Sequence, residues 1–292
     1  VVQIAVEPKT QAEMDKLSAS LDKLAEEDPT FQVTTDENSG QTIIAGMGEL
    51  HLDIIIDRLR REFGVEINVG SPQVTYKESF TQTITHREVY KKQSGGKGKF
   101  ADIEFEIGPA DEGVVGLQFI NDVKGGNIPR EYILAAEKGF KNAMSNGVLA
   151  GFPMDSMKVR LYDGSTHPVD SDALSFEVAA QLGFKASGLK AKPVVMEPIM
   201  KVEVRVPSEY LGDVTGDLNR RRAMLREVEA NSVIQIVKAD APLSEMFGYI
   251  TTLRTLTQGR ANFSMEFSHY ARLADDLADI VIKKAKGTYF FF

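Results

Sequence analysis

The order of strand and helix patterns at the start of the chain is repeated near its end, and this repeat constrains the fold more than any other feature. Two amphipathic helix patterns occur in the first copy, one after a capping box at residues 10–13 and one over residues 52–63. Strands are predicted around them at 2–6, 31–35, 42–45 and 65–69, the middle two joined by a turn at 36–40. The order β-α-β-β-α-β is that of the ferredoxin-like split motif.

The same order returns between residues 200 and 267, with little sequence identity to the first copy. Apolar residues at helical spacing predict helices over 211–218 and 246–253. Strands are predicted at 200–206, 224–229, 233–237 and 262–267. Two similar modules that flank a different segment imply three domains in an α+β chain, although 292 residues alone suggest about two.

The segment between the modules, about residues 77–192, has a different pattern. Apolar and acidic residues alternate over 102–107, which predicts a strand with one solvated face. Helical spacing predicts helices over 133–144 and 174–182, the second with Ser171 as its N-cap. We expect both helices to cover one face of a sheet.

A glycine-rich loop, Gly95-Gly96-Lys97-Gly98-Lys99, precedes the predicted strand of this middle segment. A Walker loop needs Gly-Lys followed by Ser or Thr at the start of a helix, whereas here Lys99 precedes Phe100 and a strand. The pattern therefore argues against a nucleotide site. Two interpretations stay open: a flexible turn between strands, or a backbone that lies close to RNA phosphates.

A second polar loop, Asp163-Gly164-Ser165-Thr166-His167-Pro168, is predicted between a strand and a helix, where side chains point outward. His167 is either a solvated loop residue or an RNA contact. The other histidines, His51, His86 and His269, are dispersed and lack metal-ligand spacing. We predict no metal site, no catalytic residue and no bound cofactor in this chain, and we interpret the group at residues 170–172 as helix capping.

The formal net charge of −8, from 42 acidic and 34 basic residues, argues on average against nucleic acid. Two local windows differ from this average. Residues 86–100 hold five basic residues and one acidic residue, or 5 − 1 = +4, and residues 219–226 hold four arginines and no acid. Each run is compatible with a solvated face, and Arg220, Arg221 and Arg222 also suit a helix C-terminus. Together the two windows favour an RNA partner.

Composition narrows the cellular setting. No apolar run approaches the roughly 20 residues that cross a bilayer, so we expect no membrane insertion. The absence of cysteine suits a reducing cytoplasm. The chain begins as a strand without an initiating Met or a signal peptide, which we interpret as a cut inside a longer chain. Nothing in the sequence gives a function to the aromatic residues at 289–292.

Several long strings in the sequence resemble bacterial elongation factor G, and the resemblance runs from Val1 to about Tyr270. The strings lie at residues 4–10 (Ile-Ala-Val-Glu-Pro-Lys-Thr), 41–53 (Gln-Thr-Ile-Ile-Ala-Gly-Met-Gly-Glu-Leu-His-Leu-Asp), 183–193, 197–204 (Glu-Pro-Ile-Met-Lys-Val-Glu-Val) and 242–249 (Pro-Leu-Ser-Glu-Met-Phe-Gly-Tyr). They are far more specific than a short motif.

The resemblance implies a domain order. Residues 1–77 correspond to domain III, 78–196 to domain IV and 197–270 to domain V, with a closing helix and tail at 271–292. It also implies a ribosomal protein S5 domain 2-like fold for the middle domain, between the two ferredoxin-like modules.

The resemblance further implies which residues meet RNA. In this family the tip of domain IV reaches the small-subunit decoding centre, and domain V faces large-subunit RNA. The implied tip residues are Gly95, Gly96, Lys97, Gly98, Lys99, Asp163, Gly164, Ser165 and His167. The implied second patch is Arg220, Arg221, Arg222, Arg254 and Arg260.

The implied function is to promote movement of tRNA and mRNA on the ribosome, as part of a factor whose absent N-terminal GTPase domain binds GTP and Mg. Alternatives remain: a stand-alone RNA-binding or ribosome-associated module without a motor role, or a ribosome-protection paralogue. Family members commonly read Tyr-His-Asp-Val-Asp where residues 166–170 read Thr-His-Pro-Val-Asp, and often have Gln at Lys99. Because proline restricts its own φ and the residue before it, these departures leave a specialised paralogue and a different orientation of His167 open.

Overall fold

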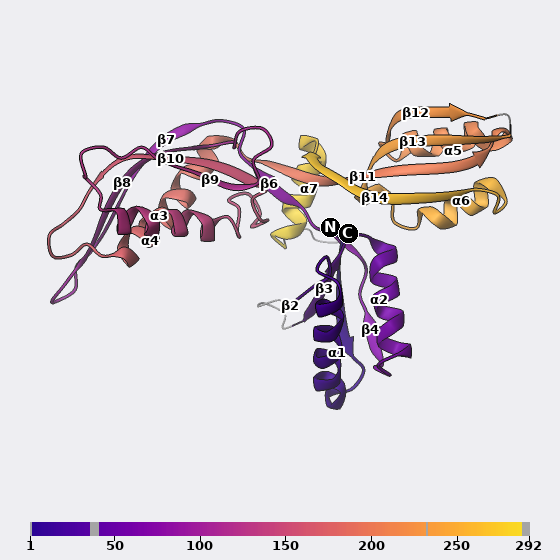
Figure 1. The fold of residues 1–292 in the computed structure, drawn as a ribbon, viewed down its shortest axis with the longest axis horizontal. Helices are drawn as coiled ribbons and strands as arrows, with labels where there is room; N and C mark the ends of the chain where they lie inside the picture. The colour runs from indigo at the N-terminus through magenta and orange to yellow at the C-terminus, as the bar shows by residue number, and fades with distance from the viewer. Residues whose placement is uncertain (1, 36–40, 232, 288–292) are drawn as a thin grey trace. The chain divides into compact units, whose positions relative to one another are not determined.

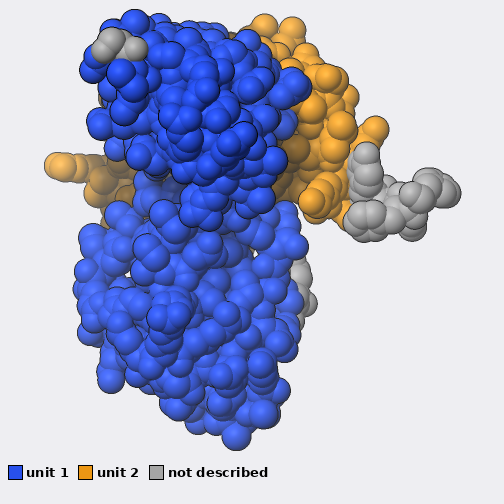
Figure 2. Space-filling model, turned by 90° about the vertical axis from the view of Figure 1, so that its right-hand side faces the viewer, with its two compact units in different colours: residues 1–75, 197–271 blue, residues 76–196, 272–292 orange. Residues whose placement is uncertain are grey.

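The computed structural model describes residues 2–35, 41–231 and 233–287 (Figure 1). It divides into two compact units, residues 1–75 with 197–271 and residues 76–196 with 272–292 (Figure 2). The turn predicted at 36–40 and the aromatic residues at 289–292 lie outside the described part of the chain.

The first ferredoxin-like module has its strands in the order β2-β3-β1-β4, with a short β5 added to β1. Its elements are β1 (Val2–Pro8), α1 (Met14–Glu27), β2 (Gln32–Thr35), β3 (Thr42–Gly46), α2 (Glu49–Arg61), β4 (Ile67–Val69) and β5 (Gln73–Val74). Alternate residues of β1 are buried against the apolar stripes of α1 and α2. The capping box predicted at Thr10 is wrong, because its side chain makes no capping bond and α1 is entered through a 3₁₀ turn.

The C-terminal module repeats this topology. Its elements are β11 (Val194–Pro207), α5 (Leu211–Arg220), β12 (Met224–Ala230), β13 (Ile234–Pro242), α6 (Tyr249–Thr257) and β14 (Asn262–Arg272). The strand order β12-β13-β11-β14 matches that of the first module position by position. The prediction of two ferredoxin-like modules is therefore confirmed.

The middle segment forms a sheet in the order β7-β8-β10-β9, with two helices on one face (Figure 1). Its elements are β6 (Lys77–Ser79), β7 (Ile84–Lys92), β8 (Lys99–Gly108), β9 (Gly116–Asn121), α3 (Arg130–Ala143), β10 (Ser156–Ser165) and α4 (Ala173–Ser187). β9 and β10 are parallel and joined through α3, whereas β7, β8 and β10 are antiparallel neighbours. The buried faces of β8 and of both helices share one apolar core that includes Phe105, Phe140 and Phe176.

The closing helix α7 (Asp275–Ala285) belongs to the same unit as this middle sheet. Its buried Ala278 packs with Val195 and Leu273, and Leu149 and Phe152 border this small cluster. The main-chain nitrogen of Leu273 donates to the oxygen of Val195 at 2.9 Å.

Candidate nucleic-acid interface

The two loops singled out in the sequence lie at one end of the middle sheet. The first, residues 93–98, joins β7 to β8, and the second, residues 166–172, joins β10 to α4. Antiparallel pairing sets Lys92 opposite Lys99 and Ser165 opposite Asp102, so both loops leave the sheet at the same edge. We call these two loops the tip.

The first tip loop presents positive charge to solvent. Gly95 and Gly96 have φ values of 30° and 156°, in the region that favours glycine, and let the chain turn sharply. Lys97 is exposed and has no ion-pair partner among the described residues, and the same holds for Lys91 and Lys92 at the end of β7. Lys91 and Lys92 lie in the basic window of residues 86–100, but they are not among the tip residues that the family resemblance implies. Alternation along β7 would expose only one of two neighbouring residues, but both lysines are exposed. They are therefore further candidates for an RNA contact.

Lys99 differs from Lys97, because its ammonium group binds the carboxylate of Asp172. Asp172 is the N-cap of α4: its Oδ1 accepts from the main-chain nitrogen of Ser175 at 2.8 Å. Burial opposes ionisation of Asp172, but the hydrogen bonds from Lys99 and Ser175 prevail and lower its pKa to about 2. The N-cap predicted at Ser171 is therefore wrong by one residue.

His167 is held by its own loop, with about half of its side chain exposed. Its Nδ1 accepts from the main-chain nitrogens of Val169 at 3.2 Å and Asp170 at 3.0 Å. An atom that accepts two N–H bonds carries no proton, so the neutral ring has its proton on Nε2. The ring of Phe100 lies beside it, with 6.1 Å between centroids. In this loop, which contains Pro168, His167 thus has a hydrogen-bonded Nδ1 and keeps Nε2 as its remaining ring donor.

Three of the implied tip residues are not in a loop. Asp163, Gly164 and Ser165 are the last residues of β10, so the loop predicted from residue 163 begins at 166. The side chain of Asp163 accepts from Asn127 at 2.9 Å and from the main chain of Gly164 at 2.8 Å, and both bonds lower its pKa. A Cβ on Gly164 would lie 2.2 Å from the main-chain oxygen of Asp102. These residues shape the strand end.

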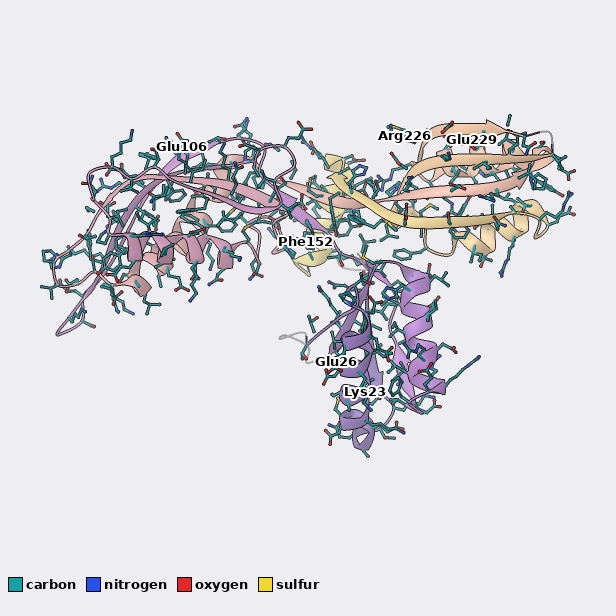
Figure 3. The ribbon with its side chains drawn as sticks, viewed as in Figure 1. Lys23, Glu26, Glu106, Phe152, Arg226 and Glu229 are labelled. Carbon is teal, nitrogen blue, oxygen red and sulfur yellow. The ribbon has the colours of Figure 1, made fainter. Side chains whose placement is uncertain are left out.

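Charges on the polar face of the middle sheet pair with one another. Arg160 on β10 binds Glu106 on β8 through two bonds of 2.9 and 2.8 Å, and Figure 3 labels Glu106. Arg87 binds the nearly buried Asp102 through two bonds of 3.0 Å, although it belongs to the basic window. Phosphate contacts need cations without such partners, so Arg87 and Arg160 are poorer candidates than the unpaired lysines near the tip.

The second basic patch is largely tied into the C-terminal module. The guanidinium of Arg221, 17% exposed, binds the Asp217 carboxylate at 2.9 Å and the main-chain oxygen of Glu245 at 2.5 Å. Arg222 binds both carboxylate oxygens of Glu197, at 2.9 and 3.1 Å, and the side chain of Glu197 is only 5% exposed.

Other arginines of this module have more exposed side chains. Arg220 is 73% exposed and lies 3.7 Å from Asp217. Arg254 is exposed on α6, with no ion pair among the described residues. Arg260 pairs with Glu209, and Arg226, labelled in Figure 3, pairs with Asp240. Arg220 and Arg254 thus differ from Arg221, Arg222 and Arg260, because they are exposed and make no close ion pair among the described residues.

No cluster of three or more potential metal ligands occurs in the residues that the structure describes. His51 instead places its Nε2 2.8 Å from Asp28, which ties α2 to the end of α1. In the same described ranges, no helix has the length and apolarity needed to cross a membrane.

Comparison with known proteins gives consecutive matches along the chain. Family models match elongation factor G domain III at residues 1–71, domain IV at residues 72–192 and the elongation factor G C-terminus at residues 194–281.

Elongation factor G of Amoebophilus asiaticus is 60% identical over 288 residues, which are 99% of this chain and 41% of that protein. Elongation factor G of Cytophaga hutchinsonii is 59% identical over the same shares. A crystal structure of a protein from Thermus thermophilus superposes with a TM-score of 0.79 at 37% identity, over 98% of this chain and 42% of that chain.

The chain therefore spans less than half the length of the relatives it matches. Its strand orders, the consecutive family matches and the identity over almost its whole length lead to one conclusion. This chain belongs to the elongation factor G family and carries the family's domain III, domain IV and C-terminal domain.

Proposed function

We propose that this chain is the ribosome-binding part of a translation factor, and that its tip contacts RNA while tRNA and mRNA move during protein synthesis. The kinship with elongation factor G supports the role in translation. The exposed Lys91, Lys92 and Lys97 at one edge of the middle sheet support RNA as the partner. GTP and Mg would bind to a domain that precedes these residues in the full-length factor, which works in the cytoplasm.

The observation that carries the proposal is the state of His167. Two main-chain N–H groups occupy its Nδ1, which fixes the ring and leaves Nε2 as a donor at the end of the domain. A fixed donor loses little conformational entropy when it binds a phosphate or a 2′-hydroxyl. The ring face can also stack on an unpaired base.

The contribution of the tip to movement is differential binding. A contact that is stronger after a step shifts the equilibrium towards the state that follows, and it also accelerates the step when it is already formed in the transition state. The tip would bind RNA more strongly once tRNA and mRNA have moved. In this proposal, GTP hydrolysis belongs to the GTP-binding domain of the full-length factor. The residues of this chain favour the arrangement of tRNA and mRNA after they have moved.

Single-round translocation kinetics of the full-length factor test the proposal. We expect His167→Ala to slow translocation about tenfold or more, with ribosome binding changed far less. His167→Asn supplies a second variant: its amide oxygen can still accept from the nitrogens of 169 and 170, but the ring is lost. It should be nearly as slow as His167→Ala if the ring itself meets RNA. Lys141→Ala, an exposed lysine near the end of α3, is the matched control and should behave as wild type.

The result that contradicts the proposal is equally specific. Wild-type translocation rates in His167→Ala and in the pair Lys97→Ala, Lys99→Ala, with unchanged folding, would show that the tip is not the working end. The chain would then be better described as a binding module without a role in movement.

A further inference from the structure

Residues 170–172 bind Gly98, the last residue of the first tip loop, and the first two residues of β8. The carboxylate of Asp170 accepts from the main-chain nitrogen of Gly98 at 3.0 Å, and its main-chain oxygen accepts from Phe100 at 2.9 Å. Ser171 Oγ donates to the main-chain oxygen of Phe100 at 2.8 Å. Asp172 binds Lys99. Three consecutive residues of the second tip loop thus hold residues 98–100, where the first tip loop enters β8, although the two segments are about 72 positions apart in the chain.

The same residues also hold His167. The main-chain nitrogen of Asp170 donates to His167 Nδ1 at 3.0 Å, and the main-chain nitrogen of His167 donates to Ser171 Oγ at 2.8 Å. Asp170 is therefore bonded to both loops, through its carboxylate on one side and its main-chain nitrogen on the other.

Gly98 fits closely against this carboxylate. A Cβ at Gly98 would lie 3.1 Å from Asp170 Oδ2 and 2.8 Å from the main-chain oxygen of Lys92. Gly98 is buried and the side chain of Asp170 is 15% exposed, so water competes weakly for the bond between them. Lys97, the exposed lysine, is the residue immediately before this anchored glycine.

We infer that Asp170 is a positioning residue that joins the two tip loops, so that Lys97 and His167 meet RNA as one preformed surface. This inference rests on the proposed function of the tip. Asp170 itself is mostly covered and bonded inward, so it acts through the residues on either side. Its carboxylate is needed as an acceptor at a fixed place, and its charge is secondary.

Two substitutions separate these roles. Asp170→Asn keeps an oxygen where Oδ1 accepts from Gly98, whereas Asp170→Ala leaves that buried N–H without a partner. In the full-length factor we expect Asp170→Ala to slow single-round translocation about tenfold and Asp170→Asn to stay within about twofold of wild type. Multiple-turnover GTP hydrolysis, measured under conditions in which mRNA does not move, should have the wild-type rate in both variants. Glu112→Ala is the matched control, because Glu112 is an exposed acid in the β8–β9 connection, at the end of β8 opposite the tip.

Amide hydrogen exchange of the same full-length variants measures the connection between the loops without using the ribosome. Asp170→Ala should increase exchange about tenfold in residues 93–100 and in residues 166–170 together, and Asp170→Asn should not. An increase confined to residues 166–170 would overturn the inference. So would Asp170→Asn translocating as slowly as Asp170→Ala, because the charge and not the acceptor position would then matter.

The two readouts separate this inference from the proposed function. If His167→Ala is slow while Asp170→Ala has wild-type exchange and wild-type translocation, the loops are not joined through Asp170 and the proposed function stands. If His167→Ala translocates normally while Asp170→Ala loosens both loops, the loops are joined but the proposed function is wrong.

Discussion

The tip of the middle domain, with the end of β7 beside it, and the arginines that follow α5 are both rich in positive charge. Their side chains differ in environment: the lysines face solvent, whereas the arginines bind carboxylates. Lys97 lies in solvent without an ion pair among the described residues, and so do Lys91 and Lys92. Arg221 and Arg222 instead bind Asp217 and Glu197, whose side chains are 11% and 5% exposed. The first cluster can exchange counterions for phosphates, whereas the second is already neutralised within its own module.

A basic run can offer its charge to a polyanion only where acidic partners within the fold do not already neutralise it. An arginine that binds a buried carboxylate contributes to stability, and removing it leaves a charge in a poorly solvated place. An exposed lysine contributes to association instead, and removing it leaves folding nearly unchanged. Substitutions in the two clusters should therefore affect different measurements.

The largest effect is expected at the internal arginine pair. Arg222→Ala removes the partner of the nearly buried Glu197 and should lower the free energy of unfolding by about 2 kcal/mol, since Arg222 is itself about one-third exposed. Urea denaturation of the 292-residue chain measures this loss. Adding Glu197→Gln removes the unpaired charge and should recover part of it. If Arg222→Ala alone were as stable as wild type, pairing with a buried carboxylate would not distinguish the two clusters.

A smaller effect, which depends on pH, is expected at the ion pair between Lys99 and Asp172 beside the tip. The folded-state pKa of Asp172 is about 2, below its ordinary 3.8, so the stabilisation is present above pH 3.8 and is lost as pH falls towards 2. Asp172→Asn keeps a favourable N-cap and removes the charge. It should cost about 1 kcal/mol at neutral pH, and its difference from wild type should vanish near pH 2. A difference that stays constant over this range would exclude the ionised carboxylate as its source.

The exposed tip lysine should affect association with no measurable effect on folding. Lys97→Ala should reduce the log–log dependence of ribosome affinity on salt concentration by about one at most, with less than about 0.5 kcal/mol change in stability. Titrations of the full-length factor at several salt concentrations give the slope. An unchanged slope, with Lys141→Ala as the reference, would mean that Lys97 touches no phosphate.

The smallest effect is expected at Arg220, the exposed neighbour of the internal pair. Arg220→Ala should change the free energy of unfolding by less than about 0.5 kcal/mol, because its side chain is 73% exposed and its contact with Asp217 is 3.7 Å long. The same urea titration as for Arg222→Ala gives the value. Equal losses in the two variants would show that local charge, and not the burial of the partner, sets the stability.

Local pattern predicted the elements of the two ferredoxin-like modules, but in the middle domain it predicted one strand and two helices and gave no range for β6, β7, β9 or β10. Alternation over residues 102–107 predicted β8, and helical spacing predicted α3 and α4, because each buries one face against the same core. Ser171 and Asp172 are both favoured N-caps, so the sequence could not decide between them. Asp163, Gly164 and Ser165 are weak strand formers, and their pairing with β8 overrides that preference.

The partners of the candidate residues could not be predicted in this way. Arg222 and Glu197 are 25 positions apart, and Gly98 and Asp170 are 72 positions apart. Which charges meet is decided by strand register and helix packing, which periodicity does not specify. The sequence located the tip, but it could not show that Lys99 is paired while Lys97 is not.

The bonded Nδ1 of His167 also gives the protein a built-in spectroscopic label. The chain has four histidines, so the imidazole nitrogen resonances are few enough to assign one by one. A ring with Nδ1 accepting and Nε2 protonated has two nitrogens with well-separated chemical shifts, unlike a ring that exchanges between tautomers. A ligand that reaches Nε2 would move one of these two signals and leave the other nearly still. The ring can thus report occupancy of the tip without any attached dye.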